Sequence, residues 1–120
     1  MSAVDRFEEL VTQRDSLGDA MRNARQEVGL TGEQLALCLG LRDHGTAGTS
    51  GTSQVYAWES GRVPRSDMLK RIVEVLRHLE GFDGDLEAEI PRLSKESRWK
   101  LDKVMHARAA ARRKQQKKQP

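Results

Sequence analysis

Apolar residues recur every three or four positions over most of the chain, which is the spacing of one face of an α-helix. Near the start, Val4, Phe7, Leu10 and Val11 share such a face, with acidic side chains opposite them. The pattern predicts an N-terminal helix within residues 1–15. We expect its apolar face to pack against the rest of the chain, and a contact with a second copy is the alternative.

Two short helices are predicted next. Ser16 begins the first of them, because an acid three residues later gives a start similar to a capping box, and Gly29 ends it. Thr31 then caps the second, with Gln34 in the box position, and Gly40 closes it. Both helices are therefore bounded by capping signals as well as by apolar spacing.

A third short helix contains Val55 and Trp58, three residues apart on one face, and it ends at Gly61. After a proline, Ser66 is predicted to cap a strongly amphipathic helix. Together with the two preceding helices, these elements make one predicted unit over residues 16–80.

The C-terminal third is predicted to consist of a linker, a helix and a tail. Residues 81–93 are acidic and include two glycines, which is typical of a boundary. Ser94 opens a last helix over residues 94–112, and residues 113–120 form a basic tail. The apolar face of that last helix holds Leu101, Val104, Met105 and Ala109. Since no segment convincingly predicts a strand, the expected fold class is all-α.

The net charge of +3 is unevenly distributed. From Arg108 onward there are six basic side chains and no acidic ones, whereas the preceding 107 residues hold 15 basic and 18 acidic residues, which sum to −3. The predicted helical unit is therefore not basic as a whole. Any attraction to a polyanion has to come from the tail or from a local patch.

Several classes of protein are not expected from the composition. There is no apolar run of 18 or more residues and no N-terminal pattern of a secretory signal, so we expect a cytoplasmic protein that does not contact a membrane. The single cysteine, Cys38, cannot form an internal disulfide and is interpreted as a small buried apolar residue. His44, His78 and His106 lack ligand spacing, so neither a metal nor another cofactor is expected.

The candidate functional residues lie in the short helix around residues 52–60. A major groove admits one α-helix and presents a distinct donor and acceptor pattern for each base pair. A helix that reads it must turn one apolar face inward and short polar side chains outward. Here Val55 and Trp58 suit the inward face, and the outward positions follow the spacing i, i+3, i+4, i+7. Those outward residues are Ser53, Tyr56, Ala57 and Ser60, with Thr52 and Gln54 flanking the N-terminal end.

Three segments within residues 16–80, LGDAMRNARQEVGLTGEQLALCLGL, SQVYAWESGRVP and MLKRIVEVL, together resemble the helix-turn-helix domain of the Xre/lambda-repressor (Cro/C1-type) family. The paired signals GLTxEQLA and VxxWExGRxP occur in the family's order. The resemblance implies a helix-turn-helix bundle, here with an added helix at each end. One departure is an insertion of about eight residues, Arg42 to Thr49, where relatives have a tight turn.

The resemblance also implies roles for individual residues. Thr52, Ser53 and Ala57 match positions that often read bases, and Arg62 and Arg65 match positions that often grip the DNA backbone. An ion pair between Arg25 and Glu59 is expected to lock the reading helix. Gln54 can bond adenine bidentately, and Tyr56 can reach a thymine methyl group or a phosphate. Free backbone N–H groups at Thr31 offer a phosphate contact, with Gln34 beside them, whereas Gly32 stands where relatives usually have glutamine.

The insertion at residues 42–50 includes much of the repeat GTAGTSGTS and no large apolar residue, so it is predicted to be a loop. Two interpretations stay open. In the first, the repeat is an inert linker whose last unit caps the following helix. In the second, Arg42, His44 and the glycine-rich backbone reach DNA phosphates.

The expected function is therefore a sequence-specific DNA-binding transcriptional regulator, a repressor of bacterial or phage type, associated with the nucleoid. The expected partner is double-stranded DNA, and a homodimer through the C-terminal helix would pair two reading helices. The first alternative is an antitoxin, which binds a protein partner and regulates its own gene through DNA. A second is an interaction scaffold without base readout. An enzyme is not expected, because no nucleophile and base converge.

Overall fold

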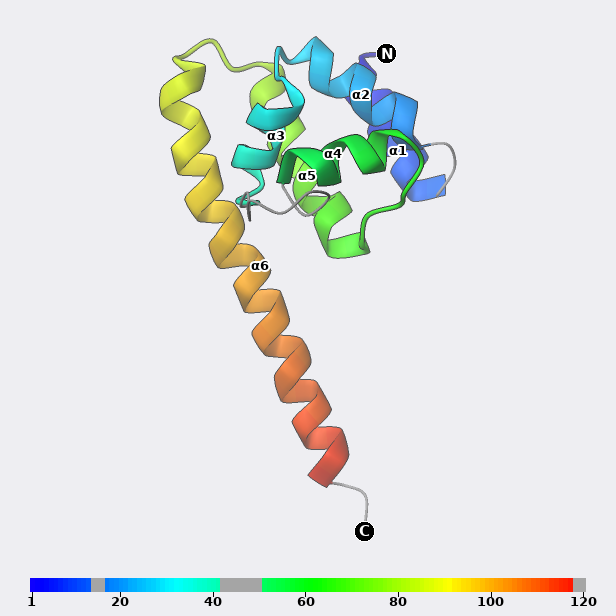
Figure 1. Ribbon diagram of the computed structural model, residues 1–120, viewed down its shortest axis with the longest axis vertical. Helices are drawn as coiled ribbons and strands as arrows, with labels where there is room; N and C mark the ends of the chain where they lie inside the picture. Colours follow the sequence, from blue (N-terminus) through cyan, green and yellow to red (C-terminus); the bar gives the residue numbers. More distant parts are fainter. Residues whose placement is uncertain (14–16, 42–50, 118–120) are drawn as a thin grey trace.

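The computed structural model describes residues 1–13, 17–41 and 51–117, and the regular elements in these ranges are all α-helices. The expected all-α fold class is therefore confirmed. Five helices form a bundle, and the sixth packs along one side of it and then projects away from it (Figure 1). The helices are α1 (Ala3–Gln13), α2 (Leu17–Glu27), α3 (Gly32–Cys38), α4 (Gly51–Glu59), α5 (Ser66–Glu80) and α6 (Leu86–Lys117).

The N-terminal helix α1 lies against α2 and α5 and closes one side of the core. Val4 and Phe7 are fully buried there, which confirms the expected packing of this helix against its own chain. At the edge of the contact, Arg77 donates hydrogen bonds to Asp5 at 2.5 Å and to Glu8 at 2.6 Å. These polar links join α1 to α5 around an apolar centre.

The last helix starts earlier than the sequence predicted. α6 begins at Leu86 and not at Ser94, so the linker predicted over residues 81–93 is wrong in its second half. The Asp85 carboxylate accepts a hydrogen bond of 3.1 Å from the backbone N–H of Glu87. This bond satisfies one of the donors that a helix leaves free at its start, and it explains the earlier boundary.

Pro91 lies inside α6 and not in front of it. Proline fits the φ angle of a helix but removes one backbone donor, and its ring crowds the preceding turn. Ile90 and Leu93, which are 8% and 2% exposed, anchor this turn in the core and offset that cost. At the other end α6 continues to Lys117, through most of the segment predicted as a tail over residues 113–120.

The helix α5 also has a different cap from the predicted one. Arg65 occupies the N-cap position with an extended backbone, and no side chain makes the capping hydrogen bond, so Ser66 is the first helical residue and not the cap. The preceding Pro64 is buried. Because proline disfavours a helical residue immediately before it, the chain stays extended up to this point and the helix begins after it.

Some of the sequence predictions lie outside the described residues. These are the helix start at Ser16, the loop at residues 42–50 with Arg42 and His44, and the last three residues of the tail. Within the described ranges, no helix combines the length and the apolar character that crossing a membrane requires.

Candidate nucleic-acid interface

The helix α4 divides into a buried and an exposed face, as its sequence predicted. Val55 is fully buried and Trp58 is 8% exposed, so both belong to the core. Tyr56 is 51% exposed, Ser60 is exposed, and Ala57 is half-buried between them. A nine-residue helix is not stable by itself, so α4 depends on this buried face, to which the tryptophan contributes a large apolar area.

The C-terminal end of α4 is held by α2 at a very close backbone approach. A Cβ atom placed on Gly18 would lie 2.9 Å from the carbonyl carbon of Glu59 and 3.2 Å from the carbonyl oxygen of Trp58. Only a glycine leaves room for this contact. The signal in the sequence was a glycine inside a helical pattern, a position where glycine costs helix stability.

A buried ion pair fixes the same end of α4. Arg25 Nη2 lies 2.8 Å from Glu59 Oε1, and Arg25 Nε donates to Glu59 Oε2 at 3.1 Å. Arg25 Nη1 also donates to the carbonyl oxygen of Leu30 at 2.9 Å, so the guanidinium joins α2, the α2–α3 turn and α4. The structure thus contains the expected pair, with both side chains less than a tenth exposed.

The N-terminal end of α4 begins at the last glycine of the repeat. Gly51 is buried, and a Cβ atom placed on it would lie 2.7 Å from Leu41 Cβ and 3.3 Å from Ala36 Cβ. This glycine lets the start of α4 sit directly on the end of α3. The next three residues, Thr52, Ser53 and Gln54, are all half-buried.

The tyrosine of α4 lies over the start of α3. A Cβ atom placed on Gly32 would be 2.8 Å from Tyr56 Cε1 and 3.0 Å from its hydroxyl oxygen. The glycine therefore makes room for the ring, which gives a structural reason for its presence at that position.

Thr31 and Gln34 form the capping box that the sequence predicted. Thr31 Oγ1 accepts from the backbone N–H of Gln34 at 3.1 Å, and Gln34 Oε1 accepts from the backbone N–H of Thr31 at 2.9 Å. The Gln34 side-chain oxygen and the backbone N–H of Thr31 are thus both engaged in holding α3, so the expectation that the Thr31 N–H is free for a phosphate is wrong. The side-chain NH2 group of Gln34 can still donate a hydrogen bond to a phosphate.

Positive charge lies at the end of α4, not on its outward face. Arg62 and Arg65 are both exposed in the connection between α4 and α5. Among the residues that the structure describes, no acidic side chain pairs with either of them. The only charged residue within α4 is Glu59, which Arg25 neutralises. The candidate interface is thus a short polar helix with two arginines next to its C-terminal end.

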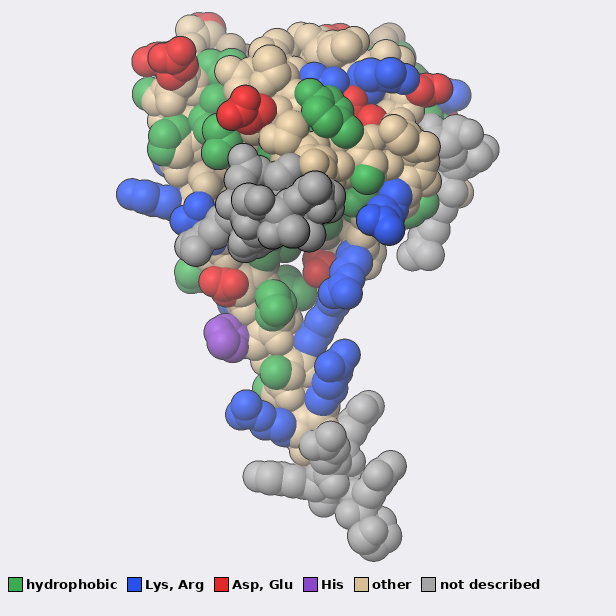
Figure 2. Space-filling view, viewed as in Figure 1, with side chains coloured by type: hydrophobic (Ala, Val, Ile, Leu, Met, Phe, Trp, Pro, Cys, Tyr) green, Lys and Arg blue, Asp and Glu red, His purple; other side chains and the backbone are tan. Residues whose placement is uncertain are grey.

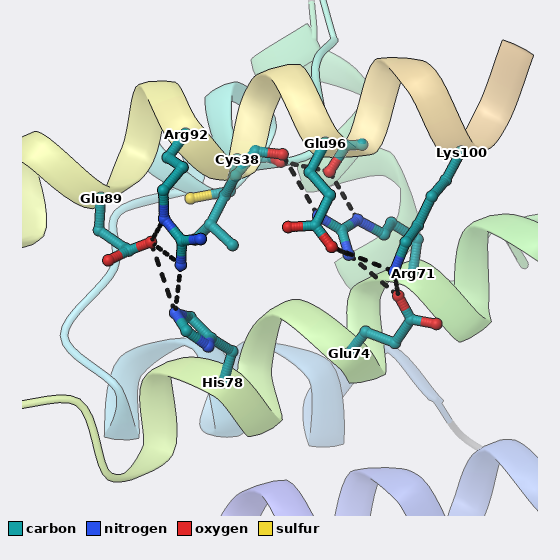
Figure 3. Close-up of polar contacts among 10 residues, drawn as sticks. Cys38, Arg71, Glu74, His78, Glu89, Arg92, Glu96 and Lys100 are labelled. Carbon is teal, nitrogen blue, oxygen red and sulfur yellow. Dashed lines mark hydrogen bonds and ion pairs between the residues drawn. The ribbon is translucent and has the colours of Figure 1, made fainter.

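Sequence reasoning missed a buried polar cluster that ties α6 to the bundle (Figure 3). Arg71 of α5, which is 5% exposed, donates through Nε to Ser97 Oγ of α6 at 2.6 Å. Ser97 in turn donates to the carbonyl oxygen of Cys38, at the end of α3, at 2.7 Å. Arg71 also donates to Glu74 at 2.9 Å, and Lys100 bridges to that carboxylate at 3.0 Å.

The buried cluster matters for the site because it fixes the end of α3, on which the start of α4 rests. Gly40, at φ +72°, follows α3, and a Cβ atom placed on it would lie 2.8 Å from Arg98 Cγ and 3.2 Å from the carbonyl oxygen of Ser94. The end of α3 therefore rests on α6 at two adjacent points. An arginine on the apolar face of the 66–80 helix was the signal in the sequence that such a cluster existed.

The lone cysteine is part of the buried cluster, because its carbonyl oxygen accepts the hydrogen bond from Ser97. Cys38 is fully buried, as the sequence predicted, and burial raises the pKa of its thiol to about 11. The thiolate is the reactive form of cysteine, so this side chain is protected from oxidation and alkylation.

The chain shows no significant match to models of known protein families, to curated protein sequences or to solved structures.

Proposed function

We propose that this chain is a sequence-specific DNA-binding transcriptional regulator, of the repressor type found in bacteria and phages. In this proposal α4 enters the major groove, with Thr52 and Gln54 at the end nearest the bases and Tyr56 beside them. Arg62 and Arg65 hold the phosphates next to the other end of α4. The hydroxyl groups of Thr31 and Ser60 and the side-chain amide of Gln34 donate the remaining hydrogen bonds to phosphates.

The observation that carries the proposal is the division of α4 into two faces. A groove about 12 Å wide admits one helix only if that helix stands at the surface and keeps its orientation. Val55 and Trp58, on one face of α4, are buried in the core, while Tyr56, on the opposite face, is half exposed. The Arg25–Glu59 pair and the contact at Gly18 then restrict the rotation of the helix about its own axis.

The chemistry of the outward face supports recognition by hydrogen bonds and methyl contacts. Gln54 has the amide geometry that pairs with adenine, whereas α4 has no Arg or Lys to bond guanine. We therefore expect a site in which adenine and thymine predominate under α4. Selection from a pool of random duplexes should enrich such a sequence, and failure to enrich any sequence would contradict the proposal.

A protein-binding function, as in an antitoxin, is the second candidate, and one observation favours it. Trp99 and Met105, two large apolar side chains of α6, are 61% and 67% exposed. Either a toxin-like partner or a second copy of the chain would cover them. Sedimentation of the chain alone tests the homodimer, and the variant Trp99→Ser/Met105→Ser should become monomeric if α6 mediates it.

The protein-partner candidate has its own test. The wild-type chain, purified from its native host, should retain a partner that Trp99→Ser/Met105→Ser loses. If neither version retains a partner while both bind DNA selectively, the antitoxin candidate is excluded.

A further inference from the structure

Among the described residues, the part of α6 beyond Arg108 makes no ion pair or hydrogen bond with the bundle. The helix contacts α3 and α5 through its first half, and its last contact with the bundle in the described residues is the ion pair of Arg108 with Asp67, at 2.7 Å. All side chains from Met105 to Lys114 are exposed. Figure 1 shows this end of the helix projecting away from the other five.

The projecting part is also strongly basic. Arg112, Arg113 and Lys114 follow one another, and no acidic residue occurs after Asp102. Figure 2 shows Lys and Arg side chains along the edge of the projecting helix, whereas the bundle carries both signs. We call residues 108–114 the basic arm.

The sequence of the basic arm suits a helix that is stabilised by a polyanion. Three consecutive alanines, Ala109 to Ala111, favour the helix without any packing. Against this, Arg112, Arg113 and Lys114 crowd three like charges into one turn, where they repel one another. Phosphates along the arm would remove that repulsion, so binding and helix formation should reinforce one another.

Ten residues before the arm, α6 passes the end of α3, close to the start of α4. Gly40 packs on Ser94 and Arg98 of α6, and Gly51 at the start of α4 packs on Leu41. The residues from Arg98 to Lys114 then span about 24 Å at 1.5 Å per residue, which corresponds to about seven base pairs of a duplex.

We propose that the basic arm binds the phosphate backbone of the same duplex, outside the stretch that α4 reads. The inference rests on the proposed function for its choice of duplex DNA as the polyanion. The arm adds affinity that does not depend on sequence, because contacts to phosphates carry no base information. Arg112, Arg113 and Lys114 are the residues assigned to this contact.

A second copy of the chain fits the arm less well than DNA does. Parallel pairing of two arms would bring Arg112, Arg113 and Lys114 of both chains together, and like charges would oppose the contact. The apolar residues Trp99 and Met105 lie closer to the bundle and do not extend into the arm. The charge of residues 108–114 therefore favours a nucleic acid over a second copy of the chain as the partner of the arm.

The test compares two variants with equal net charge. In the first, Arg112, Arg113 and Lys114 are replaced by Gln. In the second, the control, Arg6, Arg22 and Lys95 are replaced by Gln, since these are exposed cations elsewhere on the molecule. Binding to a random-sequence duplex and to a selected duplex is measured between 50 and 200 mM salt.

The arm variant should show a slope of log affinity against log salt that is shallower by about 2.7, which is 0.9 for each of three lost phosphate contacts. The control should keep the slope of the wild type. The arm variant should also lose affinity for both duplexes by the same factor. Circular dichroism should show a gain of helix on adding duplex to the wild type that is smaller in the arm variant.

The outcomes separate the two proposals. An unchanged slope in the arm variant, or an equal change in the control, overturns the role of the arm but leaves reading by α4 intact. A shallower slope in the arm variant, together with equal affinity for selected and random duplexes, supports phosphate binding by the arm. The same result overturns base recognition by α4. A chain that binds neither duplex overturns both, and an arm variant that changes only sedimentation assigns the arm to a second copy.

Discussion

Arg25 of α2 and Glu59 of α4 lie side by side in the protein interior, with two of the guanidinium nitrogens 2.8 Å and 3.1 Å from the two carboxylate oxygens. The pair is bidentate, and this geometry suits the planar fork of arginine. It joins the last residue of α4 to α2. The orientation of α4 is therefore held by a charged contact as well as by the burial of Trp58.

Replacing Glu59 by Gln should destabilise the fold, because the buried guanidinium of Arg25 would lose its counter-charge. Breaking a buried pair from one side costs about 3–5 kcal/mol. Thermal and urea unfolding would measure this loss. Asp19→Asn, which breaks the exposed pair with Arg22, is the matched control and should change stability little. An unchanged melting temperature in Glu59→Gln would show that the pair is unimportant.

Replacing Gly18 by Ala should also destabilise the fold, although alanine favours a helix. The new methyl group would meet the backbone of Glu59, which cannot rotate away. Overpacking of this kind costs about 1–3 kcal/mol. The comparison variant is Gly81→Ala, because nothing lies within 4 Å of a Cβ atom at Gly81. If Gly18→Ala is as stable as the wild type, α2 and α4 are not packed as closely as described.

Replacing Ser97 by Ala should loosen α6 from the bundle. The change leaves Arg71 Nε and the carbonyl oxygen of Cys38 without their shared hydroxyl group. An unsatisfied buried polar group costs about 1–3 kcal/mol. Hydrogen exchange of the amides in the first half of α6 should quicken with this loss. Ser94→Ala in the same helix should not have this effect, and equal protection in both variants would contradict the role of Ser97.

Stability should fall at acidic pH partly through Asp5. The hydrogen bond from Arg77, helped by bonds from Ser2, lowers the pKa of Asp5 from 3.8 to about 2. Because the folded-state pKa lies below that of the unfolded chain, the contribution is complete above about pH 4 and is lost as the pH falls towards 2. Urea midpoints measured from pH 6 to pH 2 should therefore fall less steeply in Asp5→Asn. Equal pH profiles for the variant and the wild type would exclude this contribution.

Much of the fold was predictable because its signals are local. The spacing of Val4 and Phe7, the capping box at Thr31 and the apolar pair of Val55 and Trp58 depend on residues within a few positions of one another. Each is fixed by helix geometry alone, so each prediction was confirmed by the structure. The pair of Arg25 and Glu59 came from family resemblance.

Two helix starts were mispredicted partly for local reasons, Pro64 before α5 and the Asp85 cap of α6, whereas the other errors and omissions concern contacts that are distant in sequence. The start of α6 depends on the burial of Ile90 and Leu93, which outweighs the signal of Pro91. The role of Gly32 depends on Tyr56, 24 positions later in the chain. The partner of Arg71 is likewise a serine 26 residues away. Such contacts exist only once the bundle has assembled, and no spacing rule specifies them.

The most direct test of the central claim is the ratio of affinities for a selected duplex and a scrambled duplex of the same composition, measured at one salt concentration. We predict that the wild-type chain prefers the selected duplex by about 10³-fold or more. Gln54→Ala should reduce that ratio, while Gln26→Ala on the exposed face of α2 should leave it unchanged. Equal affinity of the wild-type chain for the two duplexes would contradict the claim that α4 reads DNA.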